Sequence, residues 1–150
     1  MAAQTRKRTF TILLIEDNPD DIVFIQEALA ETGYDVILNI VRDGYEALCH
    51  LRDVVSREGI KLPDIVFLDL NLPRRSGIEF LTEMKSDPAF GLVPVVVLTT
   101  SKAADDIEQS YAHYANSYIV KPIDLNDFIL LIKQVADFWF SVAVLPGGKV

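Results

Sequence analysis

Residues 64–69 of the chain read DIVFLD, an uninterrupted apolar run between Asp64 and Asp69. Such a run is typical of a strand that is covered on both faces of a parallel sheet. Similar short apolar runs occur elsewhere along the chain. We therefore predict strands at residues 10–15, 36–41, 65–68, 94–98 and 118–120.

Helical segments separate these strands. Asn18 followed by Pro19 is a typical helix start, because asparagine caps the first turn and proline is preferred at the first helical position. We predict helices from 19 to about 32, from 45 to about 57, a short one that ends near 86, one from 103 to about 114, and one from 125 to at least 137. Strands that alternate with helices indicate an α/β domain, with a parallel sheet, right-handed crossovers and helices on both faces.

The composition narrows the possible functions. The 150 residues suffice for one domain, and 14 basic against 22 acidic residues give a net charge of -8. A nucleic-acid binder shows a basic stripe, whereas the basic cluster here is Arg6-Lys7-Arg8, so we expect no nucleic-acid partner. The single cysteine, Cys49, excludes a disulfide framework and is predicted to face the core. No apolar run is long enough for a signal peptide or a membrane span, and we expect a cytoplasmic protein.

Polar side chains follow four of the predicted strands. Because ligands bind at the carboxyl ends of parallel strands, these side chains are candidates for a functional site. They are Glu16 and Asp17 after the first strand, Asp69 after the third, Thr99 and Thr100 after the fourth, and Lys121 after the fifth. Crowded carboxylates repel one another unless a cation lies among them, and their hard oxygen atoms suit Mg²⁺. A lysine opposite them would neutralise phosphoryl oxygens.

The residues at these strand ends resemble a known family, the receiver domains of two-component response regulators. The resemblance covers residues 9–135 and rests on ILLIEDNPDD (12–21), DIVFLDLNLPRRSG (64–77), VPVVVLTTS (93–101) and SYIVKPID (117–124). It implies a flavodoxin-like, doubly wound sheet with the strand order 2-1-3-4-5. It also implies a single-domain response regulator of a phosphorelay, which catalyses only its own phosphorylation and dephosphorylation.

The resemblance implies a phosphorylation site that holds Mg²⁺. Asp69 matches the phospho-acceptor, which takes the phosphoryl group from a phosphohistidine of a histidine kinase. Glu16 and Asp17 match the acidic pair that holds the metal together with Asp69. The backbone carbonyl of Asn71 matches a further metal ligand.

The same resemblance implies a switch. Lys121 pairs with a carboxylate or phosphoryl oxygen, Thr99 moves onto the phosphoryl group, and Tyr118 turns inward with it. The bond between Lys121 and Pro122 is expected to be cis.

The two ends of the chain lie outside the resemblance. We expect residues 1–8 to be flexible and residues 136–150 to be an apolar extension of the last helix. Phe138, Trp139 and Phe140 are adjacent, so they cannot all face one core stripe. Either this tail folds back on its own domain or it joins a partner, and we predict a homodimer interface. The ending FWFSVAVLP also resembles the receivers of phytochrome-type histidine kinases.

Other functions stay open from the sequence. A phosphatase of the haloacid-dehalogenase type would need a second aspartate where Asn71 stands, and a flavin-binding protein would need a Ser-, Thr- and Gly-rich loop at Glu16 to Asn18. A phosphate sink and a binding module that works without phosphorylation are further alternatives. The segment from Arg52 to Lys61 is longer than a minimal receiver needs, and its role is open.

Overall fold

A central five-stranded parallel sheet with the strand order β2-β1-β3-β4-β5 organises the protein. The computed structural model describes residues 8–147. Its strands are β1 (Thr9–Ile15), β2 (Asp35–Val41), β3 (Ile65–Leu68), β4 (Val95–Thr99) and β5 (Ser117–Val120). Its helices are α1 (Pro19–Ala30), α2 (Gly44–Ser56), α3 (Gly77–Ser86), α4 (Ala104–Ala112), α5 (Leu125–Asp137) and a terminal π-helix, Phe138–Val142. The predicted α/β class and strand order are confirmed.

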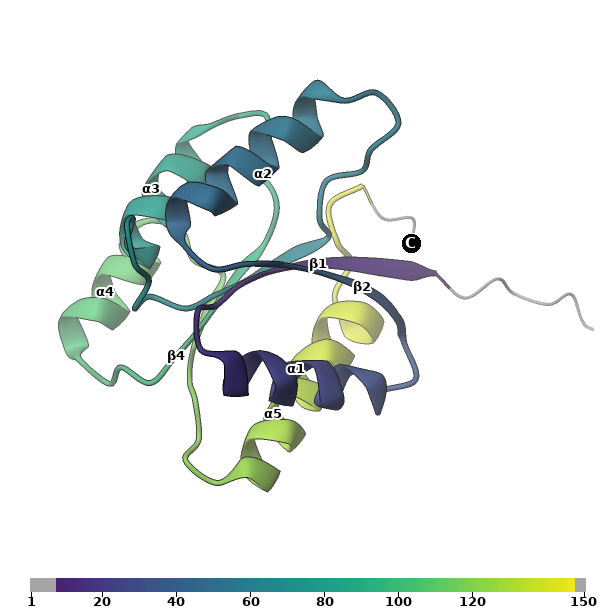
Figure 1. Ribbon diagram of the computed structural model, residues 1–150, viewed down its shortest axis with the longest axis vertical. Helices are drawn as coiled ribbons and strands as arrows, with labels where there is room; N and C mark the ends of the chain where they lie inside the picture. The colour runs from purple at the N-terminus through teal and green to yellow at the C-terminus, as the bar shows by residue number, and fades with distance from the viewer. Residues whose placement is uncertain (1–7, 148–150) are drawn as a thin grey trace, which may run out of the picture.

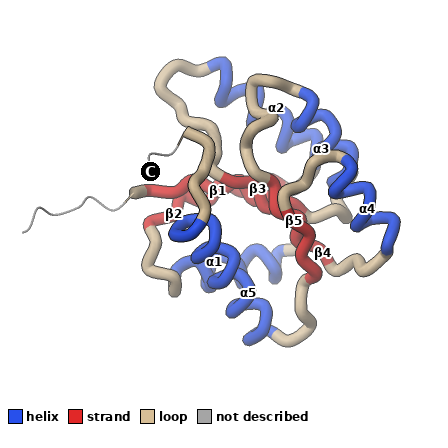
Figure 2. Tube along the Cα trace, turned by 180° about the vertical axis from the view of Figure 1, so that it is seen from behind, coloured by secondary structure: helices blue, strands red, loops and turns tan. Residues whose placement is uncertain are grey.

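The helices cover both faces of the sheet (Figure 1). Helices α1 and α5 lie side by side on one face, and α2 and α3 lie together on the other, with α4 beside α3 (Figure 2). Along β1 the side chains alternate, so that Ile12 and Leu14 pack under α1 and α5 while Leu13 and Ile15 pack under α2 and α3. Burial from both sides is the reason that the central strands are continuously apolar.

Side-chain caps set the starts of four helices. The Oδ1 atom of Asn18 accepts hydrogen bonds from the backbone N–H groups of Asp20 and Asp21, as its sequence predicts. The helices α2, α3 and α5 begin with side chains that do the same, namely Asp43, Ser76 and Asp124. The predicted position of Cys49 is wrong, since it is exposed: Ala47, Leu48 and Leu51 occupy the inward face of α2 instead.

The C-terminal tail folds back onto the amino end of β1 and the α1–β2 loop of its own domain. The ring of Phe140 stacks on Phe10, with centroids 4.1 Å apart, and meets Tyr34 edge-on. The hydroxyl of Tyr34 donates to Asp137 Oδ1 at 3.0 Å and also bonds Ser141. A π-helical turn, closed by the hydrogen bond from Ala143 N to Phe138 O, widens the helix here. Phe140 is therefore part of its own domain's packing, whereas the side chain of Phe138 stays exposed.

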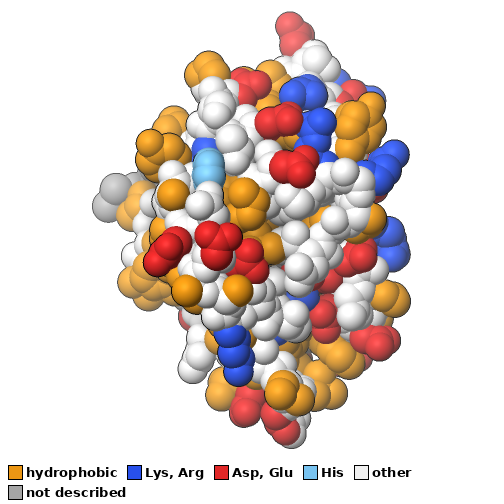
Figure 3. All heavy atoms as spheres, turned by 90° about the vertical axis from the view of Figure 1, so that its left-hand side faces the viewer, with side chains coloured by type: hydrophobic (Ala, Val, Ile, Leu, Met, Phe, Trp, Pro, Cys, Tyr) orange, Lys and Arg blue, Asp and Glu red, His pale blue; other side chains and the backbone are white. Residues whose placement is uncertain are grey.

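Charges of both signs are interspersed over the face that carries α4 (Figure 3). Helix α4 contributes Asp105 and Glu108 to the acidic side chains, both exposed. Among residues 8–147, none of the helices has the length and apolar character needed to cross a bilayer. Residues 1–7 of the predicted flexible N-terminus lie outside the described residues, and Arg8 donates to Asp64 Oδ1 at 2.9 Å.

Candidate functional site

The carboxyl ends of the strands bring the predicted site residues together. Glu16 and Asp17 follow β1, Asp69 follows β3, and Lys121 follows β5. Parallel pairing of β1 with β3, of β3 with β4 and of β4 with β5 aligns these ends at one edge of the sheet. Glu16, Asp69 and Lys121 are buried, and Asp17 is exposed beside them. Charged groups so deep in a small protein need partners, and the site supplies them.

Lys121 is the centre of this arrangement. Its Nζ atom donates to Glu16 Oε2 at 2.6 Å, to Asp21 Oδ2 at 2.8 Å and to Asp69 Oδ2 at 3.1 Å. An ammonium group carries three hydrogens, so these three carboxylates use its whole donor capacity. The backbone holds the lysine in place as well, because Lys121 N donates to Thr99 O at 2.7 Å.

Asp21 is a site residue that the sequence pattern did not predict. The sequence assigned it only to the first turn of α1, where the helix dipole favours acidic residues. A usable signal was present: Asp21 lies four residues beyond Asp17, and side chains in a helix point back toward its N-terminus. That direction carries the carboxylate from α1 to the edge of the sheet.

The pKa values of Glu16 and Lys121 are both raised at the site, for different reasons. Burial and the nearby charge of Asp69 raise the pKa of Glu16 to about 7, although the hydrogen bond from Lys121 works against the shift. Burial alone would lower the pKa of Lys121, but its hydrogen bonds to Asp21 and Glu16 outweigh burial and raise it. Lys121 therefore remains a cation at every physiological pH.

Three carboxylates form an acidic group whose donor set fits a divalent cation. Glu16, Asp17 and Asp69 each offer an oxygen, and these oxygens lie within 4.8 Å of one another. Hard carboxylate oxygens, one of them on an exposed side chain that leaves room for water ligands, suit Mg²⁺. Asn71 lies beside this group, and its backbone N–H donates to Asp69 Oδ1 at 3.1 Å. That hydrogen bond fixes one Asp69 oxygen while Lys121 holds the other.

The loop after Asp69 is fixed by a close backbone approach. A Cβ atom at Gly77 would lie 2.6 Å from the carbonyl oxygen of Asp69 and 2.6 Å from the Cα of Leu70. Gly77 N donates to Leu70 O at 3.0 Å across this contact. Only glycine allows the start of α3 to pack this tightly against the residue that carries the candidate phospho-acceptor.

The predicted switch residues lie on the adjacent strands. Thr99 is fully buried at the end of β4, and its Oγ1 atom accepts from Ser101 N at 3.5 Å. Tyr118 on β5 is half-buried, and its hydroxyl donates to Ser101 O at 2.9 Å. Burial raises the pKa of Tyr118, which therefore stays neutral. Thr99 and Tyr118 both contact Ser101, in the loop between β4 and α4.

The Lys121–Pro122 bond differs from the expectation. No cis peptide bond occurs in residues 8–147, so this bond is trans and the predicted cis isomer is wrong for this structure. The trans isomer is favoured intrinsically even before proline. Lys121 reaches all three carboxylates with this backbone.

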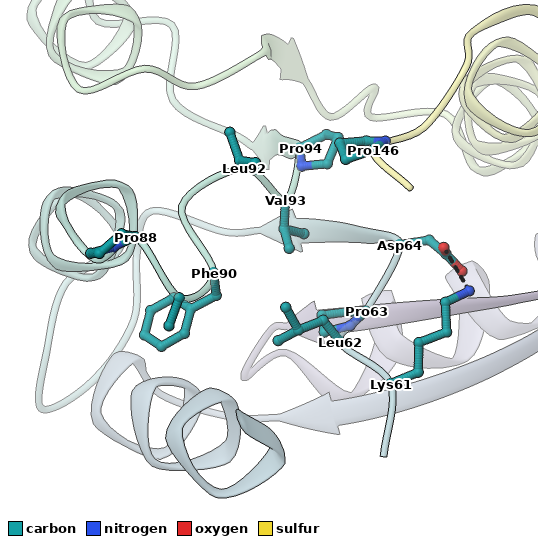
Figure 4. A pocket seen from close by; sticks show the side chains of 11 residues that line it. Lys61, Leu62, Pro63, Asp64, Pro88, Phe90, Leu92, Val93, Pro94 and Pro146 are labelled. Carbon is teal, nitrogen blue, oxygen red and sulfur yellow. Dashed lines mark ion pairs between the residues drawn. The ribbon is translucent and has the colours of Figure 1, made fainter. Parts of the chain in front are cut away.

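A second hollow of about 220 Å³ lies at the opposite edge of the sheet (Figure 4). Proline and aliphatic side chains line most of it, including Pro63, Pro94 and Pro146. Its acidic residue, Asp64, already binds Lys61 at 3.1 Å and accepts from Thr11 N at 2.8 Å. This hollow is a gap between loops. The candidate functional site lies instead at the carboxyl edge of the sheet.

A doubly wound sheet with an acidic group and a buried lysine at its carboxyl edge defines the class of the protein. Residues 12–133 match the family model of the response regulator receiver domain, and the chain belongs to this family. It is a receiver-domain response regulator of two-component signalling. This membership favours the receiver over the phosphatase and flavin-binding alternatives.

Two response regulators, Rcp1 and RcpA, are similar to this chain over most of its length. The response regulator Rcp1 of Synechocystis sp. is 38% identical over 137 residues, which are 91% of this chain and 93% of that protein. The crystal structure of the phosphorylated cyanobacterial phytochrome response regulator RcpA has 44% identity and a TM-score of 0.85, and covers 93% of this chain and 99% of its own. The Mn²⁺-bound form of Rcp1 has a TM-score of 0.84 at 38% identity, over 91% of this chain and 99% of its own.

Proposed function

We propose that this response regulator accepts a phosphoryl group on Asp69 from a phosphohistidine of a histidine kinase. The observation that carries the proposal is the double role of the Asp69 carboxylate. It belongs to the acidic group that fits Mg²⁺, and its Oδ2 atom accepts from Lys121 at 3.1 Å. Positive charge on both sides of one carboxylate is the arrangement that phosphoryl transfer requires, because the transferred group must be positioned and neutralised.

The transfer needs no reagent besides the phosphohistidine donor and the Asp69 acceptor. An Asp69 carboxylate oxygen attacks phosphorus and an O–P bond forms. The P–N bond of phosphohistidine breaks with its electron pair returning to the imidazole, which leaves as a neutral ring because its other nitrogen carries a proton. Glu16, Asp17 and Asp69 would hold Mg²⁺, which would neutralise phosphoryl oxygens when bound. Lys121 donates to a phosphoryl oxygen on the other side. In this sense the chain catalyses its own phosphorylation, and hydrolysis of the reactive acyl phosphate returns it to the starting state.

The same site supports a conformational switch through Thr99 and Tyr118. A phosphoryl group on Asp69 adds charge and acceptor oxygens next to the buried end of β4. The Thr99 hydroxyl, whose present bond to Ser101 N is long at 3.5 Å, would donate to one of them. A movement of Thr99 pulls on the loop that carries Ser101, to which the Tyr118 hydroxyl is bonded. The β4–α4 loop is thus the element whose position reports phosphorylation.

The kinase partner is proposed to be phytochrome-type. Its support is the likeness to RcpA, which is described as a phytochrome response regulator and shares 44% identity with this chain. We also propose that the phosphoryl transfer takes place in the cytoplasm, where a single unpaired cysteine such as Cys49 remains reduced.

The proposal is tested by the intact mass of the protein after incubation with Mg²⁺ and acetyl phosphate. One phosphoryl adduct that is lost in EDTA is expected. If the folded protein gains no adduct, the experiment is repeated with a phosphorylated phytochrome-type histidine kinase as the donor. Absence of the adduct with both donors would contradict phosphorylation and favour a binding module.

Mg²⁺ binding is expected to strengthen as pH rises. Glu16 has a pKa of about 7, so its carboxyl group loses a proton near neutral pH, and only the charged form ligates the metal well. Between about pH 6 and about pH 8 the affinity should increase by up to about tenfold, the effect of one proton displaced. Isothermal titration calorimetry with MgCl₂ measures it. In Glu16→Gln the pH dependence should disappear, and an unchanged slope in that variant would contradict the assignment.

We further propose that a second copy of the chain binds at the C-terminal end of α5. The side chain of Phe138 is exposed there, at 50%, and lies beside a groove of about 480 Å³ that also involves Ile119, Leu131 and Trp139. An exposed aromatic side chain next to a groove on one face suits a two-fold interface, because the aromatic side chain of each copy can pack into the groove of the other. Phe140, which the sequence also predicts in the interface, is occupied by its stacking on Phe10.

Phe138→Asp is therefore expected to convert a dimer into a monomer. A charge in the centre of an apolar contact costs more than such a contact supplies. Sedimentation velocity over a range of protein concentrations measures the state. Leu92→Asp is the matched control, since Leu92 is 82% exposed on the α3–β4 loop. This interface would be contradicted if the wild-type chain sediments as a monomer at all concentrations. It would also be contradicted if both variants have equal effects.

A further inference from the structure

The donor capacity of Lys121 is fully used by three carboxylates, and only one of them is the phospho-acceptor. The bonds to Glu16 and Asp21, at 2.6 and 2.8 Å, are shorter than the bond to Asp69 at 3.1 Å. We propose that Asp21 is a positioning residue that aims Lys121 at the phosphoryl group on Asp69. The inference rests on the proposed function and assigns Asp21 a part in the same reaction.

The start of helix α1 holds the backbone of Asp21 in a fixed position. It is the third residue of the helix, directly after Pro19 and Asp20, and its backbone N–H donates to Asn18 Oδ1 at 3.2 Å. Proline and the asparagine cap restrict the backbone of this turn. The Asp21 side chain is 22% exposed, and that of Lys121 is 4% exposed. The contact therefore joins a rigid helix start to a buried ammonium group.

Asp21 differs from the other two partners of Lys121. Glu16 and Asp69 both belong to the acidic group that fits the metal, so their orientations depend on how that group is occupied. Asp21 lies outside this group, and its bond to Lys121 does not compete with a metal or with the phosphoryl group. When Asp69 carries a phosphoryl group, two carboxylates still hold Lys121, and its third N–H points to where the phosphoryl oxygens lie. Without Asp21, one bond to Glu16 leaves the ammonium free to turn.

The test compares Asp21→Ala with Asp20→Ala. Asp20 is the exposed neighbour in the same turn, and its backbone N–H donates to the same Asn18 oxygen, so both variants lose one acidic residue at the start of α1. Phosphorylation by acetyl phosphate with saturating Mg²⁺ is followed by intact mass. We expect Asp21→Ala to be about tenfold slower than wild type, as displacement of a positioned group can cause, and Asp20→Ala to match wild type.

Three further measurements distinguish a positioning role of Asp21 from an effect of its charge and from an effect on folding. Asp21→Asn keeps an oxygen that accepts from Lys121, so it is expected to recover most of the rate. Affinity for Mg²⁺, measured by calorimetry, is expected to change little in all three variants, because Asp21 is outside the metal group. Thermal unfolding identifies any variant that fails to fold, and if Asp21→Ala does so, Asp21→Ser replaces it.

Four outcomes would overturn the inference. Equal rates for Asp21→Ala and Asp20→Ala would show that Asp21 positions nothing. If Asp21→Asn is as slow as Asp21→Ala, or if both are faster than wild type, the charge of Asp21 matters and its geometry does not. A wild-type protein that acquires no phosphoryl group from acetyl phosphate or from a phosphorylated kinase would contradict the proposed function itself, and this inference with it.

Discussion

Asp69→Asn is expected to abolish the phosphoryl adduct completely, because an amide oxygen is a poor nucleophile toward phosphorus and the acyl phosphate cannot form. The remaining acidic residues cannot substitute. Glu16 Oε2 is held by Lys121 at 2.6 Å, and Asp17 lies at the exposed side of the group. Intact mass after incubation with Mg²⁺ and acetyl phosphate should therefore show the adduct on wild type and none on the variant.

The thermal stability of Asp69→Asn distinguishes loss of the phospho-acceptor from loss of the folded structure. Asn at position 69 removes a negative charge that now crowds Glu16 and contributes to its raised pKa. In EDTA the variant should therefore unfold at a temperature equal to or above that of wild type. Asp20→Asn, on the exposed first turn of α1, is the control and should be phosphorylated normally. An adduct on Asp69→Asn at the wild-type level would refute Asp69 as the acceptor.

Lys121→Met is expected to cost about 3–5 kcal/mol of unfolding free energy above neutral pH, the range found when one partner of a buried ion pair is removed. Methionine fills much of the same space but provides no donor. Glu16, which is 2% exposed, and Asp69, which is 9% exposed, would then face each other without a cation. Urea unfolding in EDTA measures the loss.

The pH dependence of this loss has a definite sign. The pKa of Glu16 is already raised from 4.5 to about 7, and removal of the hydrogen bond from Lys121 raises it further. A group whose folded-state pKa is raised favours folding at low pH, where it is protonated, and this contribution is lost as pH rises through the folded-state pKa. Lys121→Met should therefore approach wild-type stability near about pH 5.5 and show its full deficit near about pH 8.5.

Lys133→Met is the matched control for this experiment. Lys133 also forms an ion pair, with Glu31 at 2.5 Å, but both side chains are substantially exposed. Its loss should cost less than about 1 kcal/mol at either pH, as for other surface pairs. A deficit for Lys121→Met that is as small as this, or that grows toward low pH, would contradict a buried, Lys121-centred network.

The sequence alone was sufficient for the sheet, the helix starts and most of the site. Strands buried on both faces must be apolar, and parallel strands must place their carboxyl ends together, so Glu16, Asp17, Asp69 and Lys121 could be assigned to one edge. The caps at Asn18 and Asp124 could also be identified, because a cap depends on neighbours within three residues. These features follow from local patterns, which the sequence carries directly.

Only the tertiary structure showed which contacts those residues make. The bond from Lys121 to Asp21 joins residues 100 positions apart, and the stacking of Phe140 on Phe10 joins the two ends of the domain. The inward face of α2 is formed by Ala47, Leu48, Leu51 and Val54, and Cys49 lies off this face. Side-chain direction at such sites is decided by packing between distant elements, since many rotamers satisfy the local pattern and only one satisfies its neighbours in space.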